Sequence, residues 1–196
     1  MTPPPAQRTF EAQRIWQLSQ HEFPAAACLI AAGERVHRPD VVIGIARGGV
    51  RLAEIISEQL GVPTATISVR HNTSDSPQQA ATGHLDFGPV QDMLMAVAPG
   101  GRVLLVDDIC GSGVTLGAVT KLLHDQARPT CVRTAVLCRN RSADYPVNTW
   151  GWDVADWVWF PWEERPDTHV PVEPLPALSQ LRHCESEIPR LASYRR

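Results

Sequence analysis

The chain has 196 residues, of which 43% are apolar and 20% are charged, and its formal net charge is −3. This length fits one domain with a full core, and the apolar fraction excludes disorder along the whole chain. No run approaches the roughly 20 apolar residues of a membrane helix, and the N-terminus does not resemble a secretory signal. We therefore expect no membrane contact, and the slightly negative charge disfavours a nucleic-acid partner.

Cysteine and lysine content bear on the kind of site. The five cysteines are odd in number and contain no C-x-x-C pair, which indicates reduced thiols in a cytoplasmic protein rather than a disulfide or zinc framework. The histidines are scattered, so we expect no structural metal. Lys121 is the single lysine beside 17 arginines. An anion site must therefore use arginine, backbone amides or a metal ion.

The first half of the chain predicts helices and strands in alternation. Residues 10–36 predict one or two helices, with Pro24 interrupting the run. The apolar run 41–46 predicts a buried strand, residues 50–61 predict an amphipathic helix, and the β-rich run 64–70 predicts a second strand. This order is typical of a strand–helix–strand unit.

The second half continues the alternation after a long polar segment. Residues 71–89 are too long for an ordinary connection, so they form either a functional loop or a disordered one. Buried strands are expected at 101–108 and 132–138, a helix at 112–126 and a fifth strand at 156–160. The pattern predicts an α/β fold with a mostly parallel sheet of about five strands flanked by helices.

The strongest motif is VLLVDDICGSGVTL at 103–116. A buried strand delivers Asp107 and Asp108 to its carboxyl end, where parallel sheets bind ligands. The small-residue loop 111–115 then opens a helix, so its backbone N–H groups and two hydroxyls form a phosphate cradle. Because adjacent carboxylates would repel phosphate, the two aspartates suit ribose hydroxyls or a Mg²⁺ ion held partly by the substrate.

This segment resembles the signature of the type I phosphoribosyltransferases: an apolar strand, two acidic residues, a loop ending in Thr/Ser-Gly-x-Thr, and a helix. The resemblance implies catalysis with 5-phosphoribosyl 1-diphosphate (PRPP) and Mg²⁺. Asp107 and Asp108 would act catalytically at the ribose 2′ and 3′ hydroxyls and are candidate ligands of a Mg²⁺ held mainly by substrate. The residues expected to bind PRPP here are Asp107, Asp108, Cys110, Gly111, Ser112, Gly113, Val114 and Thr115.

A second match is VVIGIARGG at 41–49, which resembles the diphosphate loop of the same family. Gly48 and Gly49 allow backbone amides to approach an anion closely, and Arg47 supplies a forked cation, expected to be catalytic. The motif alone is a weak indication of function, but it becomes specific because it lies about 60 residues before the acidic pair. The resemblance also implies that the bond from Ala46 to Arg47 can be cis.

A lid is expected because an oxocarbenium-like transition state would react with bulk water. The polar segment 71–89 is placed to be that lid, and Arg70 and His71 at its root are expected to reach the diphosphate. Disorder without a role is the alternative for this segment.

A third match covers 138–145 and 155–163, which resemble the 6-oxopurine branch of the family, including xanthine–guanine enzymes. The residues that match its W-x-x-x-P-W-[DE] pattern are Trp157, Pro161, Trp162 and Glu163. The resemblance implies that Trp157 lies against the base and that nearby backbone reads the base edge. The residues expected to bind the base are Arg139, Trp157, Val158 and Glu163. For Trp150, Trp152 and Trp159, an apolar cluster is the alternative.

Two departures from that branch concern the acceptor. Gly111 stands where those enzymes usually carry an aspartate, and Arg139 stands where they carry a lysine. Glycine cannot act as an acid or base, and arginine donates with a different geometry. The acceptor could therefore be a common purine, a modified purine or deazapurine, or a non-purine of a specialised pathway.

The resemblance implies a single phosphoribosyltransferase domain over 1–165, expected to assemble as a homodimer. Its core would span about 41–140, and residues 10–40 and 140–165 would form a small hood over the carboxyl ends of the strands. The Pro-rich residues 166–196 are expected to be an irregular extension.

Two other functions compete with the enzyme. A binding protein of the same fold could sense PRPP and regulate transcription, although nothing N-terminal resembles a DNA-binding domain. A diphosphate or nucleotide hydrolase is the third reading, and it lacks the extra acidic cluster that two metal ions require.

Overall fold

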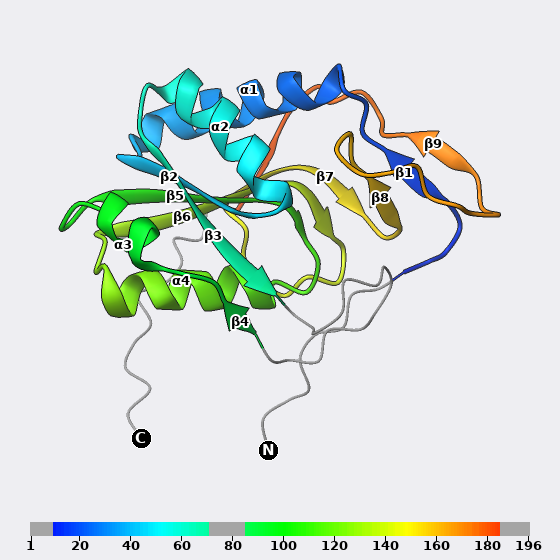
Figure 1. Cartoon of the computed structure of the whole chain (residues 1–196). Coiled ribbons are helices and arrows are strands. Elements are labelled where there is room, and N and C mark those ends of the chain that lie inside the picture. The colour runs from blue at the N-terminus through cyan, green and yellow to red at the C-terminus, as the bar shows by residue number, and fades with distance from the viewer. Residues whose placement is uncertain (1–9, 71–84, 185–196) are drawn as a thin grey trace.

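The computed structural model describes residues 10–70 and 85–184 (Figure 1). Its main sheet has seven strands in the order β10-β7-β6-β5-β2-β3-β4. The five central strands are parallel, and the two edge strands are antiparallel to their neighbours. In chain order the strands of this sheet are β2 (Val41–Ala46), β3 (Thr64–Arg70), β4 (Asp86–Phe87), β5 (Arg102–Cys110), β6 (Cys131–Asn140), β7 (Thr149–Val154) and β10 (Arg182–His183).

Helices cover both faces of this sheet, which explains the apolar runs of its inner strands. Side chains of α1 (Glu22–Glu34) and α2 (Gly48–Leu60) pack on one face in one apolar cluster. Side chains of α3 (Gln91–Ala96) and α4 (Val114–Gln126) pack on the other in a second cluster. Figure 1 shows the two helix pairs on opposite sides of the strands. The expected α/β fold is confirmed.

A second sheet has three strands in the order β8-β1-β9. It consists of β1 (Ile15–Gln17), β8 (Trp157–Trp159) and β9 (Val172–Pro174), and both neighbours run parallel to β1. In Figure 1 it lies on the side toward which the arrowheads of β3 and β7 point. This small sheet is the hood, and it gathers segments from both ends of the described chain. Its bounds differ from the predicted 10–40 and 140–165, because α1 packs on the main sheet and β9 joins the hood from beyond residue 165.

The structure corrects two predicted elements. Residues 10–36 do not begin with a helix: β1 comes first, and α1 follows from Glu22 after a turn, with a single 3-10 turn at Arg35–His37. Pro24 lies in the first turn of α1, where a missing N–H costs no hydrogen bond. The run 156–160 is not the fifth strand of the main sheet, because β8 belongs to the hood and β7 takes that place.

The structure also corrects the two segments expected to be irregular. Asp86 and Phe87 of the expected 71–89 loop pair with β3, whereas residues 71–84 lie outside the described residues. In the extension, β9 pairs with β1 and β10 pairs with β7. The domain boundary near residue 165 stays a prediction. Among the described residues, no helix is long and apolar enough to cross a membrane.

Candidate active site

Two carboxylates meet at the end of β5. Asp107 and Asp108 are both half-buried, and the backbone N–H of Asp108 donates to Oδ1 of Asp107 over 2.9 Å. Burial, and then the neighbouring charge of Asp108, raises the pKa of Asp107 well above its ordinary value. Ionisation of both carboxylates is therefore unfavourable in free energy, and a bound cation would stabilise the ionised form.

The connection from β2 to α2, called the 46–49 loop here, interlocks with this acidic pair. Its two glycines already belong to the first turn of α2, whereas the sequence predicted a helix from residue 50. The bond between Ala46 and Arg47 is cis, as expected from the resemblance, and α2 begins directly afterwards at Gly48. A Cβ on Gly48 would overlap the Asp108 carboxylate, and a Cβ on Gly49 would lie 2.5 Å from the Val106 carbonyl oxygen. Both positions therefore need glycine for close approach, and Arg47, which directly precedes α2, is exposed.

The loop after β5 ends in a helix N-terminus. Gly113 has a φ of +89°, the left-handed conformation that glycine adopts without strain, and α4 begins at the next residue. Ser112 and Gly113 therefore belong to the loop, whereas the sequence predicted a helix from 112. The N–H of Val114 donates to the Ser112 hydroxyl over 3.4 Å. The remaining first-turn N–H groups of α4 suit an anion such as a phosphate.

Arg139 lies near this loop, because β6 pairs with β5 so that Arg139 is opposite Cys110. Its guanidinium carbon is 4.9 Å from the centre of the Trp150 ring, and Nη2 donates to the Ala143 carbonyl over 3.1 Å. The Nε atom is buried and has no hydrogen-bond partner among the described residues. The stacked ring and the carbonyl thus fix the direction of this arginine.

The hood carries the other residues expected at the base. The indole of Trp157 stacks on Phe10 with 6.1 Å between ring centres and 23° between planes, and Val158 is buried. The Glu163 carboxylate accepts a hydrogen bond from the Phe160 N–H over 3.0 Å, so it stabilises the turn after β8. Trp159 donates to the Glu163 carbonyl over 3.1 Å.

Trp150 and Trp152 are buried core residues of β7. They fit the apolar-cluster interpretation of these tryptophans. The indole N–H of Trp150 donates to Asp153 over 2.9 Å, and that of Trp152 donates to the Pro176 carbonyl over 2.8 Å.

A family model described as a phosphoribosyl transferase domain matches residues 25–169, nearly three quarters of the chain. The chain belongs to the phosphoribosyltransferase family. A purine phosphoribosyltransferase from Pyrococcus horikoshii superposes with a TM-score of 0.63 at 25% identity, covering 78% of this chain and 97% of the other. The type I fold predicted from the motifs is therefore confirmed.

Two curated relatives are similar in sequence over part of their length. The transcriptional regulator GfcR of Methanocella arvoryzae is 34% identical over 105 residues, which cover 54% of this chain and 48% of that protein. The bifunctional protein PyrR of Citrifermentans bemidjiense is 33% identical over 113 residues, which cover 55% of this chain and 62% of that protein. The chain thus spans only half to three fifths of these relatives.

The phosphoribosyltransferase fold brings most of the predicted residues to one edge of the sheet. Arg47 directly follows β2, and the 111–115 loop follows β5. The acidic pair lies near the carboxyl end of β5, and Arg139 is the last residue but one of β6. Arg70 ends β3, where it is exposed and pairs in register with Asp86, whereas His71 lies outside the described residues. Tyr145, which packs against Gly113 of the 111–115 loop, was not predicted from the sequence. The sequence feature that accompanies this contact is a pair of glycines four residues apart, at 113 and 117, which leave room for a large side chain.

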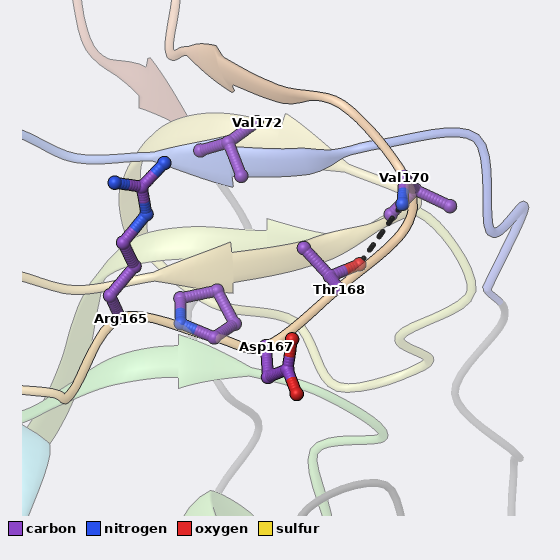
Figure 2. Close-up of a pocket in the computed structure, with 6 residues that line it drawn as sticks. Arg165, Asp167, Thr168, Val170 and Val172 are labelled. Atoms are coloured by element: carbon purple, nitrogen blue, oxygen red, sulfur yellow. Dashed lines mark hydrogen bonds between the residues drawn. The ribbon is translucent and has the colours of Figure 1, made fainter.

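Hollows on the described surface lie in two different parts of the fold. One of about 610 Å³ is lined by Arg47 and, one helical turn on, by Arg51, so it adjoins the expected diphosphate position. The other, of about 560 Å³, lies inside the curve of residues 165–172 of the hood (Figure 2). There Thr168 accepts a hydrogen bond from the Val170 N–H over 3.1 Å. No residue predicted for the active site lines this second hollow.

The close approach of the 46–49 loop to the backbone of Val106 can be tested by adding one methyl group at Gly49. We expect Gly49→Ala to weaken PRPP binding and to destabilise the fold by about 1–3 kcal/mol, because the methyl must displace the backbone at Val106. Gly117→Ala is the control, since its Cβ would meet only Tyr145 ring atoms at 3.6 Å. Thermal unfolding and calorimetric titration with PRPP measure both effects. Equal thermal stability and equal PRPP affinity of the two variants would contradict the close contact between Gly49 and Val106.

Proposed function

We propose that the protein transfers the 5-phosphoribosyl group of PRPP to a nitrogen of a purine-like base and releases diphosphate. The observation that carries this proposal is the contact between the 46–49 loop and the acidic pair. Gly48 lies so close to Asp108 that an anion at the loop amides and a ribose at the carboxylates would be neighbours. The phosphate cradle at 111–115 follows the same strand.

Different residues would contact the diphosphate, the ribose and the 5′-phosphate of PRPP. The amides of the 46–49 loop and Arg47 would bind and neutralise the leaving diphosphate. Asp107 and Asp108 would orient the ribose hydroxyls and stabilise the positive charge that develops on the sugar. The 111–115 loop, with Thr115, would hold the 5′-phosphate and fix the attacking geometry.

Magnesium fits this donor set only as an ion shared with the substrate. Among the described residues, no group of three or more His, Cys, Asp or Glu side chains gathers around one point. Asp107 and Asp108 would therefore hold Mg²⁺ together with substrate oxygens. When bound, the ion would neutralise charge on the diphosphate.

Arg139, Trp157 and Val158 are the residues we assign to the acceptor, with Glu163 fixing the turn that follows. The purine enzyme of P. horikoshii supports a purine-like acceptor. Gly111 provides no acid beside the base, so the proton of the acceptor must leave to water, substrate or another residue. A modified purine or a non-purine acceptor remains the alternative within this reaction class.

A PRPP-sensing regulator is the second candidate function. It is favoured by the two curated relatives, which are a transcriptional regulator and a bifunctional protein. Such a protein would bind PRPP at the same loops without releasing diphosphate. The cytoplasmic location, the homodimer and the single domain over 1–165 stay predictions.

One assay separates these functions. The protein is incubated with PRPP, Mg²⁺ and a panel of purines, deazapurines and pyrimidines while diphosphate release is followed, and PRPP affinity is measured by calorimetry. Release that depends on one base supports the transferase. PRPP binding without release on any base supports the regulator. Absence of PRPP binding would refute both.

The acceptor assignment predicts the effect of Arg139→Ala. Loss of a charge-assisted donor costs about 1.5–3 kcal/mol, so kcat/KM for the acceptor should fall roughly 10–150-fold. The affinity for PRPP should barely change, because Arg139 is expected on the base side. Steady-state kinetics with each substrate varied in turn measure the two effects. Weaker PRPP binding with unchanged acceptor kinetics would show that Arg139 contacts PRPP rather than the acceptor base.

A further inference from the structure

Tyr145 lies along α4 against two glycines. A Cβ on Gly113 would overlap Cβ of Tyr145, and a Cβ on Gly117 would lie 3.6 Å from two atoms of its ring. The tyrosine hydroxyl and the buried Thr120 hydroxyl share a hydrogen bond of 2.9 Å one turn further on. Burial raises the pKa of the Tyr145 phenol, so this hydroxyl stays protonated at neutral pH. The side chain is therefore held at both ends.

The segment that carries Tyr145 is internally hydrogen-bonded. Asn140 is fully buried, and its side-chain oxygen accepts hydrogen bonds from the N–H and the hydroxyl of Ser142 over 3.0 Å and 2.5 Å. The Ala143 N–H donates to the Asn140 carbonyl over 3.0 Å. The Ala143 carbonyl in turn accepts from Arg139 over 3.1 Å. A shift of this segment would therefore move the anchor of Arg139.

The two ends of this connection belong to different halves of the site. Gly113, against which Tyr145 packs, is part of the loop assigned to the 5′-phosphate, and Arg139 is assigned to the acceptor. We propose that Tyr145 is a positioning residue that ties the phosphate loop to Arg139, so that PRPP binding orders the acceptor side. The inference rests on the proposed function.

Coupling of this kind has a defined consequence. A phosphate in the 111–115 loop fixes Gly113, which fixes the position of Tyr145 and, with it, segment 140–147. The arginine is then held in one direction before the acceptor arrives. Because coupling between two binding sites is reciprocal, the acceptor must also raise the affinity for PRPP.

Hydrogen-exchange mass spectrometry with and without PRPP and Mg²⁺ tests the proposal on the full chain. In the unaltered protein, PRPP should slow exchange of peptides covering 111–116 and also of peptides covering 139–147, the latter by about fivefold or more, the lower end of ordinary coupling between sites. Tyr145→Ala should keep the first protection and lose the second. Thr64→Val, at an exposed threonine of β3, is the control and should keep both.

Each outcome has one meaning. Protection confined to 111–116 in the unaltered protein overturns the inference and leaves the proposed function intact. Protection of 139–147 that persists in Tyr145→Ala also overturns it. If Tyr145→Ala does not fold, Tyr145→Phe and Thr120→Val decide, because they delete the same hydrogen bond from either side; we expect both to reduce the protection of 139–147. A lack of protection anywhere would instead count against PRPP binding itself.

Discussion

Asp107→Asn is expected to make the protein more stable and nearly inactive. Asparagine keeps the oxygen that accepts the Asp108 N–H hydrogen bond, so the local backbone should be preserved. It removes a negative charge that burial and Asp108 make unfavourable. Turnover should fall by about 10²–10³-fold, the usual cost of losing one electrostatic contact to a transition state.

The gain in stability should depend on pH in one direction. Because the pKa of Asp107 is raised in the folded state, folding favours the protonated acid, and this contribution is complete below the unfolded pKa of about 3.9. It is lost as the pH rises through the folded pKa. The variant should therefore be more stable than the original protein at pH 7 and equal to it near pH 3. A gain of 1 kcal/mol corresponds to about 2–4 °C in Tm.

Thermal unfolding in EDTA across this pH range, together with the diphosphate-release assay at pH 7, measures both effects. Asp125→Asn is the control, since Asp125 forms an exposed ion pair with Lys121 on α4. A variant at Asp107 that loses stability and keeps its activity would show that this carboxylate supports the fold rather than the reaction.

The positions of the residues in and after β5 were predictable because local pattern and chemistry coincide there. A two-sided apolar run, two acids and a small-residue loop each require the same strand–loop–helix unit, so Asp107, Asp108 and Thr115 could be placed from the sequence. The same holds for 41–49, where a buried strand ends in Arg47 and two glycines. Both predictions agree with β2, β5 and the helices that follow them.

The hood was less predictable because its strands are short and pair with distant residues. The three residues of β1 gain their partners from positions more than 140 residues away, Trp157 and Val172. Nothing local distinguishes Ile15–Gln17 from the start of a helix. The strand β7 was not predicted, because its tryptophans, Trp150 and Trp152, suggested a ligand-binding cluster. An aromatic-rich segment can be assigned to the core of a sheet only when its neighbouring strands are known.

A buried ion pair far from the active site gives the largest expected loss of stability. Glu34, at the end of α1, is 1% exposed, and its carboxylate accepts two hydrogen bonds from Arg133 over 2.7 Å and 3.0 Å. Thr149 donates a third over 2.5 Å. Arg133 is near the start of β6, whereas Arg139 is near its end. The pair therefore joins α1 to the sheet near the amino end of β6, away from the residues proposed to bind PRPP.

Arg133→Met should lower stability by about 3–5 kcal/mol, because it leaves the Glu34 carboxylate buried without its cation. In a chain of this size that loss corresponds to a fall in Tm of about 6–20 °C. Lys121→Met is the matched control: its partner Asp125 is exposed, so the cost should stay at or below about 1 kcal/mol. The double variant Glu34→Met/Arg133→Met should recover most of the loss, since two apolar side chains leave no buried charge. PRPP affinity should be unchanged in all three, so a variant at Arg133 that stays folded and loses PRPP binding would contradict this placement.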